Sequence, residues 1–271
     1  MLKNEEFIRI VTYVKDKYGI ELSKKKEIVY GRLQNYIRNN GYKSFNDYMN
    51  AVEADSSGAL EKKLVDMLTT NHTFFMREFE HFDFCKTVVL PYLRRKEKEK
   101  KDLAIWCAAA SSGEEPYTIA MLLDDFFGYE HKDWDTQILA TDVSVKVLQH
   151  AVKGIYKKEQ VEPLPDQWKR KYFHPLPGGE NVVVTDELKK QVIFRQFNLM
   201  EPFTFRRKMH IVFLRNVMIY FDTETKREIV KKVYDAMEPG GYLFIGRTET
   251  LDRTVAPFDI VQPSVFRKKE V

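Results

Sequence analysis

The chain has 271 residues, of which 44% are hydrophobic and 31% charged, and its formal net charge is +4. This length accommodates one large and one small domain, and no stretch approaches the ~18–20 consecutive apolar residues of a membrane-spanning helix. The sequence shows no secretory signal, nucleic-acid-binding signature or metal-ligand spacing. We therefore expect a cytoplasmic protein with no membrane insertion, nucleic-acid partner or metal site.

Residues 1–80 are predicted to form a helical domain and a linker. Apolar residues recur at helical spacing near the start, and Gly19 is typical of a helix end. A second helix is indicated between residues 23 and 38, and two more at 44–54 and 59–68. One side of the second helix is apolar and the other is basic. The basic side chains are Lys24, Lys25, Arg32 and Arg38.

After Asp102, short apolar strands alternate with helices, so residues 81–271 are assigned to an α/β domain. The alternation predicts a doubly wound, mostly parallel sheet with helices on both faces. Two last strands near 258–267 are expected to form an antiparallel hairpin at one edge. Residues 152–191 are too long for one crossover, and we interpret them as an inserted subdomain with an antiparallel strand; a long loop is the alternative. Expected strands lie at 103–107, 137–141, 192–197, 211–215 and 242–246, and helices at 115–127, 144–151 and 223–237.

Small residues at 108–113 follow the first strand, and Glu114 and Glu115 open the next helix. Small side chains allow a ligand to approach the backbone at the carboxyl edge of the sheet. Two carboxylates at a helix start repel a pyrophosphate but favour a cationic ligand, such as an ammonium or sulfonium group. The alternative is that both acids only complement the helix dipole.

Polar residues also end two other strands of the predicted sheet. Asp142 follows the second strand, where an acid can accept hydrogen bonds from ribose hydroxyls; its alternative role is a helix N-cap. A later strand ends in Arg215 and Asn216, followed by Tyr220, at the edge where a substrate is held. Tyr220 could also be a core residue. Pro-Gly-Gly at 239–241, between a helix and a strand, completes the order of elements that methyltransferase folds show.

Together with a linker motif that contains Asn71, Thr73 and Arg77, these segments resemble the chemotaxis receptor methyltransferases, the CheR family. The resemblance covers nearly the whole chain and depends on two long motifs, Trp-x-Ala-Ala-Ala-Ser-x-Gly-Glu-Glu-Pro-Tyr and Arg-Asn-Val-Met-Ile-Tyr-Phe. One departure is Met76, which stands before Arg77 where many members have Phe-Phe-Arg without a break. The spacing is preserved if Asn71, Thr73 and Arg77 set the register, which we favour.

The resemblance implies a class I methyltransferase-like fold and S-adenosyl-L-methionine as cofactor, with S-adenosyl-L-homocysteine as product. It implies that Arg77 pairs with the methionine carboxylate, that Glu115 faces the ammonium group and that Asp142 binds the ribose. A fork-shaped guanidinium suits a carboxylate partner. Arg77, Arg215 and Tyr220 would serve the catalytic step as positioning groups. The other implied cofactor contacts are Asn71, Thr73, Asn198, Leu199, Arg215 and Asn216.

The implied reaction is the methylation of glutamate side chains on the cytoplasmic domains of chemotaxis receptors. The basic face of the second helix would then dock an acidic receptor helix bundle; a solvated helix face is the alternative. A second hypothesis is a regulatory module that binds S-adenosylmethionine without turnover, but the positioning residues favour an enzyme. We expect a monomer.

Overall fold

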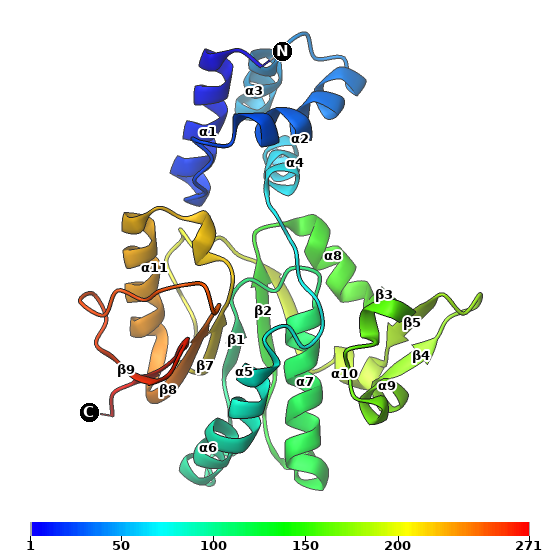
Figure 1. Cartoon of the computed structure of the whole chain (residues 1–271), viewed down its shortest axis with the longest axis vertical. Helices are drawn as coiled ribbons and strands as arrows, with labels where there is room; N and C mark the ends of the chain where they lie inside the picture. The colour runs from blue at the N-terminus through cyan, green and yellow to red at the C-terminus, as the bar shows by residue number, and fades with distance from the viewer. Residues whose placement is uncertain (1, 271) are drawn as a thin grey trace.

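A computed structural model describes residues 2–270 of the chain (Figure 1). The amino-terminal part is a helical domain, as predicted. Gly19 ends the first helix in the left-handed conformation, and the Ser44 side chain caps the third by accepting a hydrogen bond from Asp47 N. The four helices are α1 (Asn4–Tyr18), α2 (Lys26–Asn39), α3 (Phe45–Ala54) and α4 (Ala59–Leu68).

The second domain is built on a seven-stranded sheet with the order β6-β2-β1-β7-β8-β10-β9. Strands β6, β2, β1, β7 and β8 are parallel, whereas β10 runs antiparallel to both β8 and β9. The predicted parallel sheet and its edge hairpin are therefore confirmed. The strands are β1 (Ile105–Cys107), β2 (Ile138–Asp142), β6 (Val192–Gln196), β7 (Met209–Leu214), β8 (Met237–Ile245), β9 (Phe258–Gln262) and β10 (Val265–Lys268).

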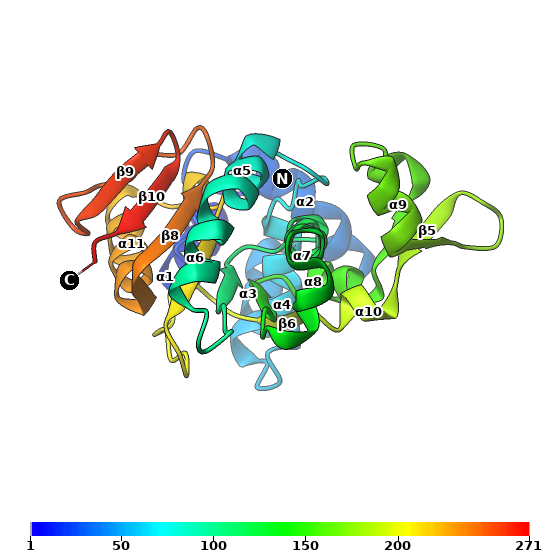
Figure 2. The same ribbon diagram turned by 90° about the horizontal axis from the view of Figure 1, so that it is seen from below.

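Helices cover both faces of this sheet, and its central strands β1 and β7 are therefore buried on both sides. Trp106 of β1 packs into the core shared with α11 and the helical domain, whereas its neighbours Ile105 and Cys107 pack toward α5, α6 and α7 (Figure 2). None of the helices between residues 2 and 270 is long and apolar enough to cross a membrane. The helices are α5 (Phe79–Phe84), α6 (Leu90–Lys96), α7 (Glu114–Phe127), α8 (Val145–Lys153) and α11 (Thr223–Ala236), and a π-helical segment (Cys85–Val89) joins α5 to α6.

The insertion between β2 and β6 forms a small sheet of its own. It has three antiparallel strands in the order β3-β5-β4 and projects to one side of the main sheet (Figure 1). The predicted antiparallel insertion is confirmed, and the alternative of a long loop is wrong. Its elements are β3 (Ile155–Lys157), α9 (Asp166–Tyr172), β4 (Phe173–Pro175), β5 (Asn181–Val184) and α10 (Asp186–Lys189).

One element boundary differs from the sequence-based expectation. Pro-Gly-Gly at 239–241 was expected to separate a helix from a strand, but β8 begins at Met237 and contains all three residues. The pairing of β8 with β7 is irregular here, between Met209 and Ile211. A Cβ on Gly241 would lie 2.9 Å from the Glu238 carbonyl oxygen. The glycine therefore permits a bulged strand, whereas the helix has already ended at Ala236.

The helical domain packs against the carboxyl edge of the main sheet (Figure 1). On one side, Ile20 forms a β-bridge with Phe221, and Glu21 N donates a hydrogen bond to the Tyr220 carbonyl oxygen at 2.8 Å. On the other side, Ser144 Oγ lies 2.6 Å from Asp66 Oδ1. The two contacts hold the domains together around a cavity between them.

Candidate active site

A cavity lies between the helical domain, the linker and the carboxyl ends of β1, β2 and β7. This is the edge at which doubly wound sheets bind their ligands. Every residue that the sequence analysis assigned to the cofactor or to the catalytic step contributes to its wall. These residues are Asn71, Thr73, Arg77, Glu115, Asp142, Asn198, Leu199, Arg215, Asn216 and Tyr220.

The two acids at the start of α7 point in different directions. Glu115 lines the cavity, and its Oε1 accepts a hydrogen bond from the Cys107 thiol at 3.1 Å. Glu114 is buried beneath the loop, where it accepts a hydrogen bond from Ser112 Oγ at 2.7 Å. Burial raises the pKa of Glu114. Glu115 is therefore the candidate for a ligand, and Glu114 belongs to the helix start.

Asp142 is buried at the end of β2 and faces the cavity. Its Oδ2 accepts a hydrogen bond from Ser111 N at 2.9 Å, and its Oδ1 accepts one from Ser144 N at 2.9 Å. Burial raises the pKa of this carboxyl, and the backbone hydrogen bonds act against that rise. Each oxygen keeps a second lone pair, so the side chain can still accept hydroxyl donors. The N-cap of α8 is Ser144 rather than Asp142.

Arg77 is the linker residue whose positive charge can still bind an anion. Its Nη1 donates to the His72 carbonyl oxygen at 2.8 Å. Over the described range 2–270, no carboxylate lies within salt-bridge distance of its guanidinium group. Phe75 is fully buried, whereas Asn71, Thr73 and Arg77 reach the cavity.

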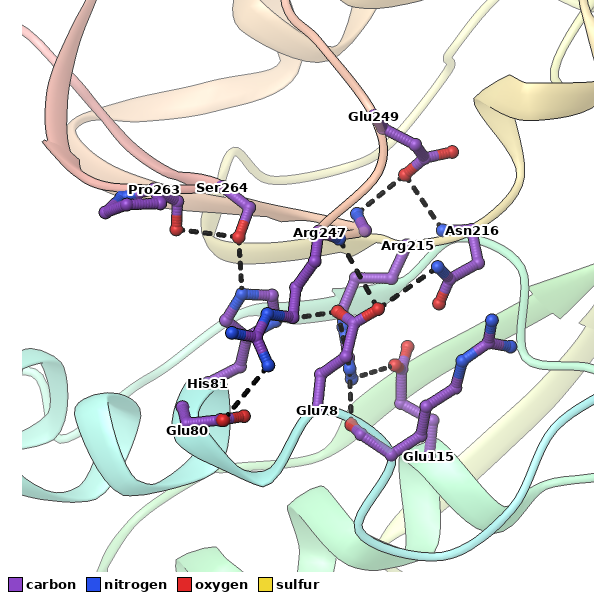
Figure 3. A network of polar contacts seen from close by, with 12 residues as sticks. Glu78, Glu80, His81, Glu115, Arg215, Asn216, Arg247, Glu249, Pro263 and Ser264 are labelled. Atoms are coloured by element: carbon purple, nitrogen blue, oxygen red, sulfur yellow. Dashed lines mark hydrogen bonds and ion pairs between the residues drawn. The ribbon is translucent and has the colours of Figure 1, made fainter.

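Arg215, by contrast, is surrounded by acceptors (Figure 3). Its side chain is 1% exposed, and its Nη1 lies 2.5 Å from Glu115 Oε2. Its Nη2 lies 3.2 Å from Glu78 Oε2 and also donates to the Arg77 carbonyl oxygen. The guanidinium carbon lies 5.2 Å from the centroid of the Phe82 ring. Arg215 therefore joins the linker to α7 and β7 instead of offering a free charge.

The remaining wall residues are held by contacts between the two domains. Asn198 Nδ2 donates to the Lys17 carbonyl oxygen at 2.7 Å, and its Oδ1 accepts from Met200 N at 3.0 Å. The buried Leu199 next to it is an apolar part of the wall. Tyr220 donates its hydroxyl to the Thr70 carbonyl oxygen at 3.3 Å.

The four basic residues assigned to a docking face differ in their surroundings. Lys24 and Lys25 precede α2, and Lys25 and Arg32 line the cavity. Arg32 Nη1 donates to the carbonyl oxygens of Leu68 at 2.6 Å and Thr69 at 3.1 Å, so this side chain holds the linker. Lys24 and Arg38 are exposed.

Several residues that shape the site were not predicted from the sequence. Glu78 bonds to Arg215, and the half-buried Glu249 accepts backbone hydrogen bonds from Gly246, Asn216 and Ile219. Glu78 stands next to Arg77 in the linker motif, which is a signal that could have been used. Glu249 follows no recognisable motif. The helical domain also contributes Tyr18, Ile20 and Leu22 to the cavity wall.

The sheet is parallel except for β10 near one edge, and Asp142 lines the cavity at the end of β2. This arrangement is that of a class I methyltransferase. Residues 71–266 match the family model described as "CheR methyltransferase, SAM binding domain", and residues 5–69 match "CheR methyltransferase, all-alpha domain". The chain belongs to the CheR methyltransferase family. It is a methyltransferase with a domain that binds S-adenosylmethionine, and the alternative of a regulatory module without turnover is not favoured.

Full-length relatives agree with this assignment. A chemotaxis protein methyltransferase of Borreliella burgdorferi is 37% identical over 271 residues, covering 98% of this chain and 95% of that protein. A chemotaxis protein methyltransferase of Escherichia coli is 34% identical, covering 98% of this chain and 91% of that protein. Chemotaxis protein methyltransferase Cher2 of Pseudomonas putida is 32% identical, covering 96% of both chains.

Proposed function

We propose that this chain transfers the methyl group of S-adenosylmethionine to glutamate side chains on the cytoplasmic domains of chemotaxis receptors. The products would be glutamyl methyl esters and S-adenosylhomocysteine. The names of the full-length relatives support a chemotaxis substrate. We further propose that the enzyme acts in the cytoplasm as a monomer.

One observation carries the cofactor assignment: an unpaired cation and a carboxylate line the same cavity. The Arg77 guanidinium, which has no carboxylate partner among residues 2–270, suits the methionine carboxylate. Glu115 suits the ammonium group, and Asp142 suits the ribose hydroxyls. Asn198 and Leu199 would flank the adenine, and Asn71, Thr73 and Asn216 would complete the contacts.

The chemistry requires positioning more than acid–base catalysis. When bound, S-adenosylmethionine supplies a methyl group on a positively charged sulfur. The acceptor glutamate, with an ordinary pKa of ~4.3, is already an anion at neutral pH, so no residue of this chain needs to remove a proton. Arg215 and Tyr220 would instead hold the reacting groups in line, and such alignment can contribute roughly 7–11 kcal/mol to the barrier reduction.

The helical domain would also exclude water from the reaction. Tyr220 is held from this side by Thr70 and by the main-chain contact of its carbonyl oxygen with Glu21. Lys25 Nζ lies 5.7 Å from the centroid of the Tyr220 ring, so a positive charge stands near the proposed transfer point. An incoming carboxylate would be attracted to it.

The proposal is tested by incubating the chain with methyl-labelled cofactor and the cytoplasmic fragment of a receptor. We expect label in the receptor that is released by base, because carboxyl methyl esters hydrolyse whereas N-methyl groups persist. The variants Arg77→Ala and Asp142→Ala should bind S-adenosylhomocysteine much more weakly than the parent chain. Base-stable label would exclude glutamate as acceptor, and unchanged affinity in both variants would exclude the cofactor assignment.

A further inference from the structure

Glu78 lies beside Arg215 and is not among the residues that line the cavity, yet its carboxylate contacts three residues on two other segments of the chain (Figure 3). Its Oε2 lies 3.2 Å from Arg215 Nη2, at the end of β7. Its Oε1 accepts hydrogen bonds from Asn216 Nδ2 at 3.2 Å and from Arg247 N, after β8, at 3.4 Å. The side chain is 13% exposed. Its own backbone is in the left-handed region, with φ at 54°, which is uncommon for glutamate.

The charges around Arg215 do not cancel. Its guanidinium group contacts both Glu115 and Glu78, so one positive charge stands between two negative charges. The three side chains together carry one negative charge. Glu115 faces the cavity, so the excess charge acts on whatever occupies it. Without the Glu78 carboxylate, Arg215 and Glu115 would form a neutral pair.

Neighbouring groups leave this excess charge in place. Burial, and after it the charge of Arg215, lowers the pKa of His81 to about 4, so this imidazole is neutral at pH 7. The Arg247 guanidinium pairs with Glu80 Oε1 at 3.0 Å. Burial acts to raise the pKa of Glu78, but the Arg215 charge and the hydrogen bond from Asn216 outweigh it and lower that pKa. Glu78 is therefore ionised at neutral pH.

We propose that Glu78 is a positioning residue for the cofactor. From a position that does not line the cavity, it pairs with Arg215 and balances its charge, so that Glu115 keeps a net negative charge toward an ammonium group. This inference depends on the proposed function, in which Glu115 faces the ammonium group of the cofactor. Two adjacent linker residues would then serve the same end of the ligand. Arg77 would bind its carboxylate, and Glu78 would keep Glu115 available to its ammonium group.

The test uses Glu78→Gln, which keeps the size of the side chain and removes its charge. The ligands are S-adenosylhomocysteine, an analogue with hydrogen in place of the amino group, and an analogue with hydrogen in place of the carboxylate. Calorimetric titration gives the Kd of each. We expect the Kd of the two ammonium-bearing ligands to rise about tenfold, the order of effect of one partly buried charge. The deaminated analogue, which keeps the carboxylate, should not lose affinity, because removing a negative charge does not weaken an anionic ligand.

Glu80→Gln is the matched control, since it removes a carboxylate two residues away whose partner Arg247 is exposed, so that solvent screens the charge left behind. It should change none of the three Kd values. A Glu78→Gln variant that binds S-adenosylhomocysteine like the parent would overturn the proposal. So would an equal loss of affinity for the deaminated analogue, because Glu78 would then support the linker and Arg77 as a whole.

A double variant tests the charge argument where Glu78→Gln alone folds poorly. Glu78→Gln with Arg215→Gln removes one negative and one positive charge and leaves that of Glu115. We expect the double variant to bind S-adenosylhomocysteine more tightly than its deaminated analogue, as the proposal requires of the parent chain, and equal Kd values for the two ligands would contradict the proposal. Failure of the proposed function looks different: the parent chain itself would then bind S-adenosylhomocysteine and its deaminated analogue equally well.

Discussion

The two arginines of the site show how surroundings decide the role of a side chain. Arg77 faces the cavity and donates to a single carbonyl oxygen through its side chain, whereas Arg215 is 1% exposed and contacts two carboxylates. Burying a charge is costly unless it is paired, so Arg215 depends on Glu78 and Glu115 for its position. The free guanidinium is the one that can recognise a ligand.

His81 gives a prediction at the same scale. Burial lowers its pKa from the ordinary 6.5 to about 4, so the folded chain binds this proton only at a lower pH than the unfolded chain does. The unfolded state then binds more protons between these values, and stability decreases with acidification. We expect the free energy of unfolding to lose about 3 kcal/mol from this group between pH 7 and pH 4.

Urea denaturation over a pH series measures this loss. His81→Gln should show a flatter pH dependence than the parent chain over that window. His174→Gln, at an exposed imidazole on β4, should retain the slope of the parent. Equal slopes in the parent chain and His81→Gln would disprove the assignment.

At the scale of single elements, the loop before α7 decides where Glu115 points. Gly113 is the residue before the helix and has φ at 99°, a conformation that strains other residues. A Cβ there would lie 2.8 Å from the Tyr156 hydroxyl and 3.2 Å from the Ala151 backbone. The start of α7 is therefore packed directly against α8 and the insertion.

Gly113→Ala is expected to destabilise the chain by about 1–3 kcal/mol, because it combines backbone strain with overpacking. It should also weaken S-adenosylhomocysteine binding, since α7 must shift to relieve the contacts and Glu115 shifts with it. Thermal denaturation and calorimetric titration measure the two effects.

Gly31→Ala in α2 is the matched control. No atom lies within 4 Å of the added Cβ, and alanine is the better helix former, so this variant should be more stable by about 0.5–1 kcal/mol. A Gly113→Ala chain as stable as Gly31→Ala would contradict the packing argument.

At the scale of the whole molecule, the helical domain has two functions in the proposed mechanism. It closes one side of the cavity through Tyr18, Ile20 and Leu22, and it presents the exposed Lys24 and Arg38 to solution. Lys25 and Arg32 belong to the cavity wall, so replacing them would disturb cofactor binding together with docking. A test of receptor docking must therefore replace the exposed residues Lys24 and Arg38.

Lys24→Glu with Arg38→Glu should reduce the rate of receptor methylation several-fold, because the reversed charges repel an acidic helix bundle. The affinity for S-adenosylhomocysteine should not change. The difference in rate should shrink as salt is added, since exposed charges are screened. Methylation rates at low and high salt measure both expectations.

Lys98→Glu with Lys100→Glu makes the same change in net charge just after α6, at the opposite end of the molecule from the helical domain (Figure 1). This control should methylate receptor at the rate of the parent chain. Equal slowing in both double variants would show a general charge effect instead of a docking face.

Most of the fold could be predicted because its signals are local. The periodicity of apolar residues, together with Gly19 and Ser44, indicated the helices of the first domain to within a few residues. Strands that end in Asp142 and Arg215 indicated which edge of the sheet holds the site. The Pro-Gly-Gly segment was misinterpreted because its bulge depends on pairing with β7, which a local pattern does not contain.

By itself, the sequence determined the α/β class, the order of its elements and the chemical groups that the cavity contains. Tertiary structure alone decided how these groups are paired. Arg215 meets Glu115 across 100 positions and Glu78 across 137, and no periodicity or motif links residues so far apart. Burial then sets the energetic cost of each charged group, because a carboxylate or guanidinium removed from water is stable only with the partners that packing brings to it.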